Sequence, residues 1–375
     1  MTHEPYGGYE QGPIRPPSEA GSLLLRVTRN CPWNRCKFCP VYKGTEFSVR
    51  PTGHVLRDID AVYRAMQTLS GEAEARRSGV RGEAPGDPIA WQSAAHWLRN
   101  GRRSVFLQDA DSLIIPPADM VAILNHLAAK FPGIPRVTYY ARSSTVARLD
   151  SHDLQAFREA GLNRLHIGLE SGANEVLRRM HKGTTQKNQI MAGQKVKQAG
   201  MELSEYYMPG LGGRDLWEAN ARETAAALNE INPDFIRLRT LAIPCGAPLY
   251  EDYQAGRFDR PRDVEMAREI LLFLESLQGI TSTVASDHIL NLLPEVKGTL
   301  PQDQGRMLAV IETFLQLSPA EQCLYQVGRR TGVFSGLDDL EDPVRRRRAE
   351  EIMRKNAITP ANVDGIIDEL MRRFV

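Results

Sequence analysis

The chain has 375 residues, with 47 Lys and Arg against 46 Asp and Glu, and its net charge is +1. With so balanced a charge, the chain as a whole has no net electrostatic attraction to nucleic acid or to an anionic membrane, so there is no clear nucleic-acid signal. No apolar run reaches the ~20 residues that a membrane-spanning helix needs, and the first residues do not resemble a secretory signal, so we expect no membrane protein.

The first hundred residues predict an arm, a strand, a helix and an insertion. Residues 1–20 are rich in Gly, Pro and Glu, which predicts an extended N-terminal arm on the surface or a disordered one. The nearly continuous apolar run Ser22–Arg29 predicts a buried strand. The spacing of apolar residues over Asp58–Leu69 predicts a helix. Residues 71–103 are a polar insertion, in which 91–98 predict a short helix.

From Ser104 onward, strands and helices alternate regularly. The predicted strands are Ser104–Gln108, Arg136–Ala141, Arg164–Gly168, Glu202–Met208 and Phe235–Ala242, and the predicted helices are Pro117–Lys130, Ser151–Ala160, Glu175–Met180, Gln186–Ala199 and Leu216–Ile231. Together with the first strand, this alternation predicts an α/β fold of right-handed βαβ units around a parallel sheet. We expect the active site at the carboxyl ends of the strands.

After Pro244 the pattern becomes mostly helical. The predicted helices are Asp263–Leu277, Asp303–Leu317, Val344–Asn356 and Asn362–Phe374. We therefore predict an arm over 1–20, an α/β domain over 21–245 and a helical C-terminal cap or substrate region over 246–375.

Three of the five cysteines lie in the loop after the first predicted strand. They are Cys31, Cys36 and Cys39, in the spacing C-x4-C-x2-C. Thiolates this close repel one another unless a cation holds them, and soft sulfur ligands favour zinc or iron–sulfur clusters. A disulfide would leave an odd cysteine in the loop and partners too close for relaxed geometry.

The missing fourth ligand separates the two metal hypotheses. A structural zinc site closes with four ligands, but no second C-x2-C pair exists, and Cys245 and Cys323 are single and distant in the sequence. A cubane cluster held by three cysteines leaves one iron open to a small molecule. We favour the cluster, with a zinc protein as the alternative. So few cysteines, mostly clustered, suit a reducing cytoplasm, where we expect the protein to act.

The cysteine loop resembles that of the radical S-adenosylmethionine (SAM) superfamily. The usual spacing is C-x3-C-x2-C with an aromatic residue before the last cysteine; Phe38 fills that position, and the first gap is one residue longer here. The resemblance implies a partial (βα)6 TIM-like barrel and a 4Fe–4S cluster on Cys31, Cys36 and Cys39. It also implies SAM as cofactor, its reductive cleavage, hydrogen abstraction from an unidentified substrate, and an electron donor such as ferredoxin or flavodoxin. The layout is closest to the coproporphyrinogen oxidase-like and Elongator-like branch.

Polar residues follow the second and third strands of the predicted barrel. Asp109 and Asp111 come directly after Gln108, and by analogy with the family one of them would bind the SAM amine. Arg142 follows the next strand and could pair with the SAM carboxylate, because a guanidinium binds a carboxylate bidentately. The structural alternatives are a helix cap for the aspartates and a salt bridge for Arg142.

The fourth and fifth strands carry the other cofactor candidates. Gly168 and Glu170, in His166–Gly172, resemble the family's Gly-x-x-Glu stretch near the SAM ribose and adenine, and Arg178 would be a further contact or part of a solvated helix face. Met208 and Gly210 resemble the glycine-rich turn along adenine, although a tight turn alone would also explain them.

His288 is the catalytic candidate, because histidine titrates near neutral pH and could transfer a proton; a structural histidine is the alternative. Arg237 and Arg239 lie on one face of the sixth strand and need anionic partners. The run Arg345–Arg348 predicts a solvated helix rather than a nucleic-acid site. A second possible function is a non-catalytic, cluster-bearing chaperone or carrier, for instance of heme.

Overall fold

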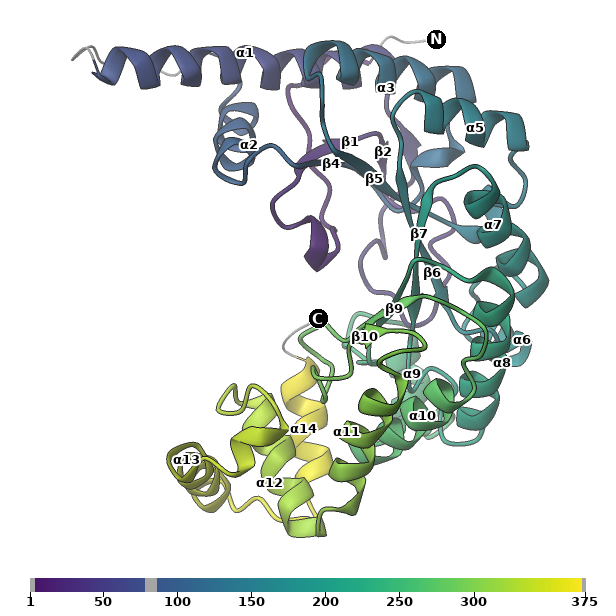
Figure 1. The fold of residues 1–375 in the computed structure, drawn as a ribbon, viewed down its shortest axis with the longest axis vertical. Helices are drawn as coiled ribbons and strands as arrows, with labels where there is room; N and C mark the ends of the chain where they lie inside the picture. The colour runs from purple at the N-terminus through teal and green to yellow at the C-terminus, as the bar shows by residue number, and fades with distance from the viewer. Residues whose placement is uncertain (1–3, 78–85, 373–375) are drawn as a thin grey trace. The chain divides into compact units, whose positions relative to one another are not determined.

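The computed structural model describes residues 4–77 and 86–372 (Figure 1). The chain forms two compact units that interleave along the sequence. The first comprises Met1–Pro32, Gly44–Ile167 and Lys195–Leu203, and the second comprises Trp33–Lys43, Gly168–Gln194 and Ser204–Val375. Part of the polar insertion, 78–85, lies outside the described residues.

The first unit is built on parallel strands in the order β1-β4-β5-β6. Their bounds are Leu23–Arg26, Ser104–Gln108, Arg136–Ala141 and Arg164–Glu170. Leu25 pairs with Leu107, and Tyr140 pairs with His166. Every residue of β4 is buried, as expected for a parallel strand covered on both faces. The short strands β2 (Thr28–Arg29) and β3 (Ser48–Val49) form a separate antiparallel pair that was not predicted.

The first unit contains five helices and two 3₁₀ turns among the residues that the structure describes. The helices are α1 (Thr52–Arg77), α2 (Pro88–Arg99), α3 (Pro117–Lys130), α4 (Ser143–Val146) and α5 (Ser151–Glu159), with 3₁₀ turns at Pro17–Glu19 and Ser112–Ile114. Asp87 accepts hydrogen bonds from Ile89 N and Ala90 N, and Pro88 occupies the first turn of α2. Trp97 of α2 packs edge-on against Phe131 after α3, with ring centroids 5.1 Å apart. The helix predicted over Asp58–Leu69 is present as α1 and extends beyond the predicted residues at both ends. The helix predicted over 91–98 is confirmed as α2.

The N-terminal arm is bound to the first unit rather than lying loosely on its surface. Tyr9 is buried, and its hydroxyl donates to the Leu24 carbonyl. Gly12 and Gln108 exchange hydrogen bonds of 2.8 and 3.1 Å. These bonds satisfy the side chain of Gln108 at the end of β4 and hold the described part of the extended arm on the first unit.

The second unit contains the carboxyl end of β6 and the strands that follow it, in the order β7-β8-β9-β10. The strands are β7 (Glu202–Tyr207), β8 (Phe235–Leu238), β9 (Thr283–Ala285) and β10 (Gly298–Thr299), and the helices are α6 (Asn174–Arg179), α7 (Gln186–Gln198), α8 (Trp217–Ile231), α9 (Leu249–Gln254), α10 (Asp263–Glu275), α11 (Gln304–Gln316), α12 (Pro319–Arg330), α13 (Pro343–Lys355) and α14 (Val363–Arg372). The six predicted strands are present, and β9 and β10 were missed. The predicted α/β class, a partial TIM-like fold with a helical C-terminal region, is confirmed.

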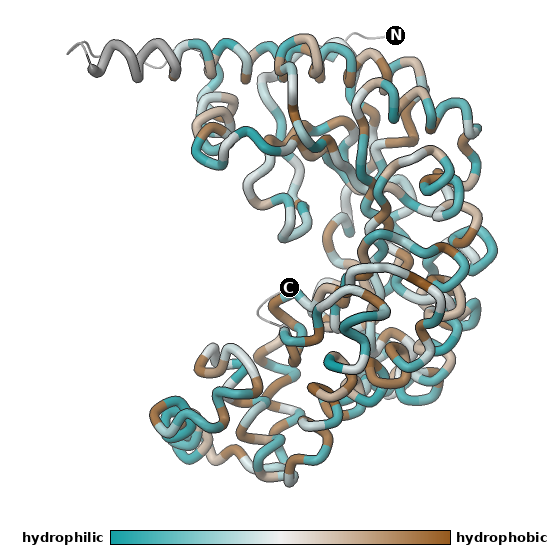
Figure 2. The backbone as a smooth tube through the Cα atoms, viewed as in Figure 1, coloured by the Kyte–Doolittle hydropathy of each residue, from teal (hydrophilic) through white to brown (hydrophobic). Residues whose placement is uncertain are grey.

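The C-terminal helices share a hydrophobic core of their own. It contains eight buried residues: Ala242, Leu290, Cys323, Val327, Ile358, Val363, Ile367 and Met371. A buried ion pair between Arg330 and Asp263, at 2.7 Å, joins α12 to α10. Hydrophobic and hydrophilic residues alternate along these helices (Figure 2), as expected for helices with one face on a core. No helix in the described part of the chain is both long and apolar enough to cross a membrane.

Candidate functional site

The segment between Cys36 and Cys39 is fixed to the second unit through Lys37. Lys37 N donates to the Met180 carbonyl at 3.0 Å, and Leu249 N donates to the Lys37 carbonyl at 2.8 Å. The ammonium group of Lys37 forms an ion pair of 2.7 Å with Asp252. Because both backbone groups and the side chain of one residue are bound, the position of this short segment is well determined.

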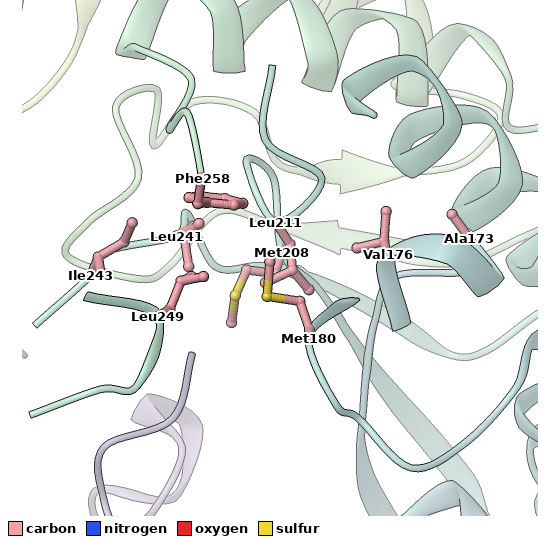
Figure 3. Close-up of a cluster of buried hydrophobic side chains, with 9 residues drawn as sticks. All are labelled: Ala173, Val176, Met180, Met208, Leu211, Leu241, Ile243, Leu249 and Phe258. Atoms are coloured by element: carbon pink, nitrogen blue, oxygen red, sulfur yellow. The ribbon is translucent and has the colours of Figure 1, made fainter. Parts of the chain in front are cut away.

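Phe38 lies against a buried apolar cluster that gathers residues from five parts of the second unit. The cluster contains Ala173, Val176, Met180, Met208, Leu211, Leu241, Ile243, Leu249 and Phe258. Met180, Met208 and Leu211 lie together at its centre (Figure 3). The ammonium nitrogen of Lys182 lies 5.7 Å from the Phe38 ring centroid, within the range of a cation–π contact. The predicted residues Phe38 and Met208 are thus brought together.

The three loop cysteines are all partly buried. Cys31 belongs to the first unit, and Cys36 and Cys39 belong to the second. Across 4–77 and 86–372, no group of three or more His, Cys, Asp and Glu side chains is arranged to hold a metal ion. The chemistry of the donors nevertheless fits an iron–sulfur cluster, because paired thiolates on a fixed C-x2-C segment are its usual ligands.

Cys245, which is distant in the sequence, belongs to a segment that lies beside the cysteine loop. The same segment supplies Leu249 N to the Lys37 carbonyl, and a Cβ on Gly246 would lie 3.7 Å from Pro40. Cys245 is exposed, whereas Cys323 is buried in the C-terminal core. The distance of Cys245 from the loop in the sequence therefore does not keep its segment away from the loop in the structure.

The end of β6 places a carboxylate in a confined position. Glu170 has a left-handed backbone conformation (φ 65°), which is unusual for a residue other than glycine. Its Oε1 lies 3.3 Å from Lys182 Nζ, and its Oε2 is buried without a hydrogen-bond partner in the described structure. A Cβ on Gly168 would lie 2.4 Å from Glu170 Oε1, so glycine leaves room for this carboxylate. An unsatisfied buried oxygen fits a ligand that donates a hydrogen bond.

Glu205 on β7 is a second carboxyl in this region, and the sequence prediction did not assign it. It is buried, and burial together with Glu170 raises its pKa well above the ordinary value, against the opposing charge of Lys182. Its Oε2 also has no hydrogen-bond partner among the described residues. A glutamate in the middle of a predicted buried strand was the signal that could have found it, because such a group needs a partner.

The turn after β7 is held by another unassigned carboxyl, Glu269 of α10. Gly210 N donates to Glu269 Oε2 at 2.9 Å, and the Tyr207 hydroxyl and Asn220 Nδ2 donate to Oε1 at 2.8 and 2.7 Å. Gly210 has a φ of 88°, which favours glycine. Met208 N in turn donates to the Glu170 carbonyl at 2.9 Å, so the turn and the end of β6 are coupled.

The predicted SAM contacts of the first unit already have protein partners. Asp109 is buried and accepts from Arg26 Nη2 at 2.8 Å and from Asn30 N at 3.2 Å. Asp111 is buried and accepts from Thr145 Oγ1 at 2.5 Å and from Arg142 N at 3.3 Å, at the start of α4. Burial raises the pKa of Asp111 to about 6. The salt bridge observed here joins Asp109 to Arg26, and the SAM role of both aspartates and of Arg142 stays a prediction.

Arg178 and His288 are the remaining predicted site residues of the second unit. Arg178 lines an open cavity of about 500 Å³ together with Trp33, Arg35 and His181. Burial, followed by the charge of Arg239, lowers the pKa of His288 to about 4, so the expectation that it titrates near neutral pH is wrong. Its catalytic role stays a prediction.

The arginines of the sixth predicted strand were expected to need anionic partners. Asp287, next to His288, pairs with Arg237 of β8 and supplies one of them from within the protein.

Comparison with known proteins places this arrangement in a family. Residues 25–224 match the model of the radical SAM superfamily. A tRNA uridine(34) acetyltransferase of Methanocaldococcus infernus is 28% identical over 129 residues, which is 33% of this chain and 23% of that protein. The 4′-phospho-dehydrooxetanocin synthase of Priestia megaterium is 26% identical over 186 residues, which is 49% of this chain and 22% of that protein.

Solved structures of similar proteins include coproporphyrinogen III oxidase (HemN) from Escherichia coli, with a TM-score of 0.45 and 14% identity, covering 68% of this chain and 50% of the other. The chain spans less than a quarter of the length of the two curated relatives. The family match, by contrast, covers more than half of the chain and includes the cysteine loop and the strands β4 to β7, so the chain belongs to the radical SAM superfamily.

Proposed function

We propose that this chain is a radical SAM enzyme that cleaves SAM reductively and abstracts hydrogen from a substrate that is still unidentified. The observation that carries the proposal is the family match over 25–224, a range that contains Cys31, Cys36 and Cys39, the cluster ligands that we propose. The same family match does not choose among oxidation, methylation and rearrangement, because one fold supports many reactions.

The cofactors of this family are a 4Fe–4S cluster and SAM, which supply the reductive cleavage and the hydrogen abstraction when they are bound. The chain's contribution is to hold and orient them. Cys31, Cys36 and Cys39 would ligate the cluster, and the fixed backbone of Lys37 would keep two of these thiolates in place. Phe38 would exclude water beside them, because its ring is packed against the apolar cluster.

Glu170 would bind the ribose of SAM. Its Oε2 is buried and lacks a protein partner in the described structure, so a ribose hydroxyl that donates to it would satisfy this oxygen. Lys182 orients Glu170 through the contact of 3.3 Å with Oε1. The turn at Met208 and Gly210 would lie along the adenine, and Arg178 would be an outer contact. A ferredoxin or flavodoxin in the cytoplasm would supply the electron.

The test is the formation of 5′-deoxyadenosine. Anaerobically purified protein is reconstituted with iron and sulfide, mixed with SAM and dithionite, and assayed by mass spectrometry. We expect 5′-deoxyadenosine to accumulate in proportion to the cluster content. A fully loaded cluster without this product would contradict the enzyme proposal. If such a protein bound heme tightly, it would instead be a carrier, and zinc without iron would select the zinc alternative.

Changing Glu170 to alanine is expected to weaken SAM binding without loss of the cluster. A hydrogen bond to a charged group contributes about 1.5–3 kcal/mol, which corresponds to roughly a 10- to 150-fold rise in Kd. Calorimetry with SAM on reconstituted protein measures this change, and the iron content and visible absorbance should stay at the wild-type level. Glu175→Ala, on the exposed face of α6, is the matched control and should bind SAM normally. An unchanged Kd in Glu170→Ala would remove Glu170 from the SAM site.

A further inference from the structure

A cationic recess in the first unit lies at the opposite ends of the strands from the predicted cofactor residues. Its volume is about 490 Å³, and its lining includes Arg99, Arg103, Arg136, Ser18, Asn100 and Ser104. We call it the arginine recess. Ser104 and Arg136 are the first residues of β4 and β5 and pair with each other in register. Asp109 and Arg142 follow the other ends of the same strands, one strand length of roughly 17–20 Å away.

The arginine recess has an excess of positive charge. Its lining contains three arginines and no carboxylate. Arg99 and Arg103 are exposed, and neither forms an ion pair with any residue that the structure describes. Glu19, whose Oε2 lies 3.4 Å from Arg136 Nη2, is fully buried. Burial alone would raise its pKa, but His166, Ser22 and Arg136 outweigh burial and hold the pKa below its ordinary value. One buried carboxylate therefore leaves at least two guanidinium groups available to an anion.

Two polar atoms of the lining are buried without a hydrogen-bond partner in the described part of the chain. They are Nε of Arg136 and the hydroxyl of Ser18. The remaining contacts of Arg136 are long, because Nη2 lies 3.4 Å from both the Ser18 carbonyl and Glu19 Oε2. Buried polar atoms normally have partners, and each one left unsatisfied costs about 1–3 kcal/mol. Two lining residues thus carry donors that no acceptor in the described part of the chain uses.

The lining also limits what kind of ligand fits. It contains no aromatic ring and no large apolar side chain, so it offers neither a stacking surface for a base nor an apolar surface for a hydrophobic ligand. Arginine forks match the oxygen geometry of phosphate and carboxylate groups. Three arginines with a serine hydroxyl around one recess supply more donors than one carboxylate can accept, and a phosphate group can use them.

We propose that the arginine recess is a binding site for a phosphate-bearing anion, separate from the SAM site. The phosphate can come from a free polyphosphate, such as the tail of a nucleotide, or from the backbone of a single-stranded nucleic acid. Both present the same chemistry to the arginines and to Ser18. The proposal does not depend on the reaction that the enzyme catalyses.

The experiment measures binding of two probes to the full chain. Pyrophosphate is titrated by calorimetry, and a fluorescein-labelled RNA oligonucleotide is titrated by anisotropy at several salt concentrations. The Arg99→Ala/Arg103→Ala double variant is expected to raise Kd for the bound probe about tenfold or more, because it removes charge-assisted hydrogen bonds. Arg99 and Arg103 are exposed, so the variant should keep the wild-type circular dichroism spectrum. Ser18→Ala should weaken binding less.

The matched control is Arg222→Ala/Arg268→Ala, which removes two exposed arginines from α8 and α10 and changes the net charge equally. It should bind both probes as the wild type does. Tight pyrophosphate binding with weak RNA binding would identify a free phosphate ligand. The reverse, with the salt slope for RNA reduced by about 0.7 for each lost phosphate contact, would identify a nucleic-acid backbone. The proposal would be overturned if neither probe bound, or if the control variant lost as much affinity for the probe as Arg99→Ala/Arg103→Ala does. It would also be overturned if citrate competed better than pyrophosphate for the site.

Discussion

The Cys36→Ala variant is expected to contain almost no iron after anaerobic reconstitution, against roughly four irons per chain in the wild type. Cys36 directly precedes Lys37, whose backbone N–H and carbonyl are both hydrogen-bonded and whose ammonium group pairs with Asp252. This short segment cannot shift easily to bring another atom into the place of the lost thiolate. The 5′-deoxyadenosine product should disappear together with the iron.

Because Cys245 belongs to a segment beside the loop, the experiment needs a control for its replacing Cys36 as a ligand. Its segment lies beside the loop, so a rescue by this exposed thiol is tested with Cys36→Ala/Cys245→Ala. Cys323→Ala, in the buried C-terminal core, should keep its iron and shows the effect of losing a cysteine as such. Iron and visible absorbance are measured on all variants. Full iron in Cys36→Ala would show that Cys36 is not a ligand. Iron that is lost only in the double variant would make Cys245 a replacement ligand.

Regular strands and helices could be predicted because each carries its signal locally. The bounds predicted for β4, β5 and α3 agree with the structure to the residue. A strand buried on both faces is a continuous apolar run, and Pro117 at the start of α3 marks the first turn of a helix. The cysteine spacing and Phe38 are equally local, so they led to the superfamily without any knowledge of the fold.

Elements and residues whose role depends on distant partners were missed or misjudged. The short strands β9 and β10 are two or three residues long and carry no periodicity of their own. Glu205, Lys182 and Glu269 gain their roles from residues 12 to 62 positions away. His288 was expected to titrate near neutral pH, but burial and the charge of Arg239 keep it neutral there. Such effects follow from tertiary structure, which residue spacing does not contain.

The Glu269→Ala variant is expected to be strongly destabilised and to lose the shape of the turn at Gly210. Glu269 is fully buried and accepts hydrogen bonds from the Tyr207 hydroxyl, Asn220 Nδ2 and Gly210 N. Asn220 Nδ2 keeps a second acceptor, the Met208 carbonyl, but Tyr207 and Gly210 would be left with buried, unsatisfied donors. At about 1–3 kcal/mol each, these two groups predict a loss of about 2–6 kcal/mol in unfolding free energy. Thermal unfolding measures it, and SAM affinity should fall as well, because Met208 and Gly210 form the proposed adenine turn.

The pKa of the Glu269 carboxyl determines how this loss of unfolding free energy should change with pH. Burial raises the pKa of Glu269 from 4.5 to about 7, against the three donors, which favour the ionised form. Between these two values the folded protein holds a proton that the unfolded chain releases, so this contribution to stability is full below about pH 4.5 and is lost as the pH rises through 7. The loss amounts to about 3 kcal/mol. The stability gap between wild type and Glu269→Ala should therefore be larger at pH 5 than at pH 8. Glu269→Gln, which keeps the volume but places an amide N–H₂ against one of the donors, should lie between them. A gap that stays constant over this range would mean that Glu269 is ionised throughout and that its three donors outweigh burial.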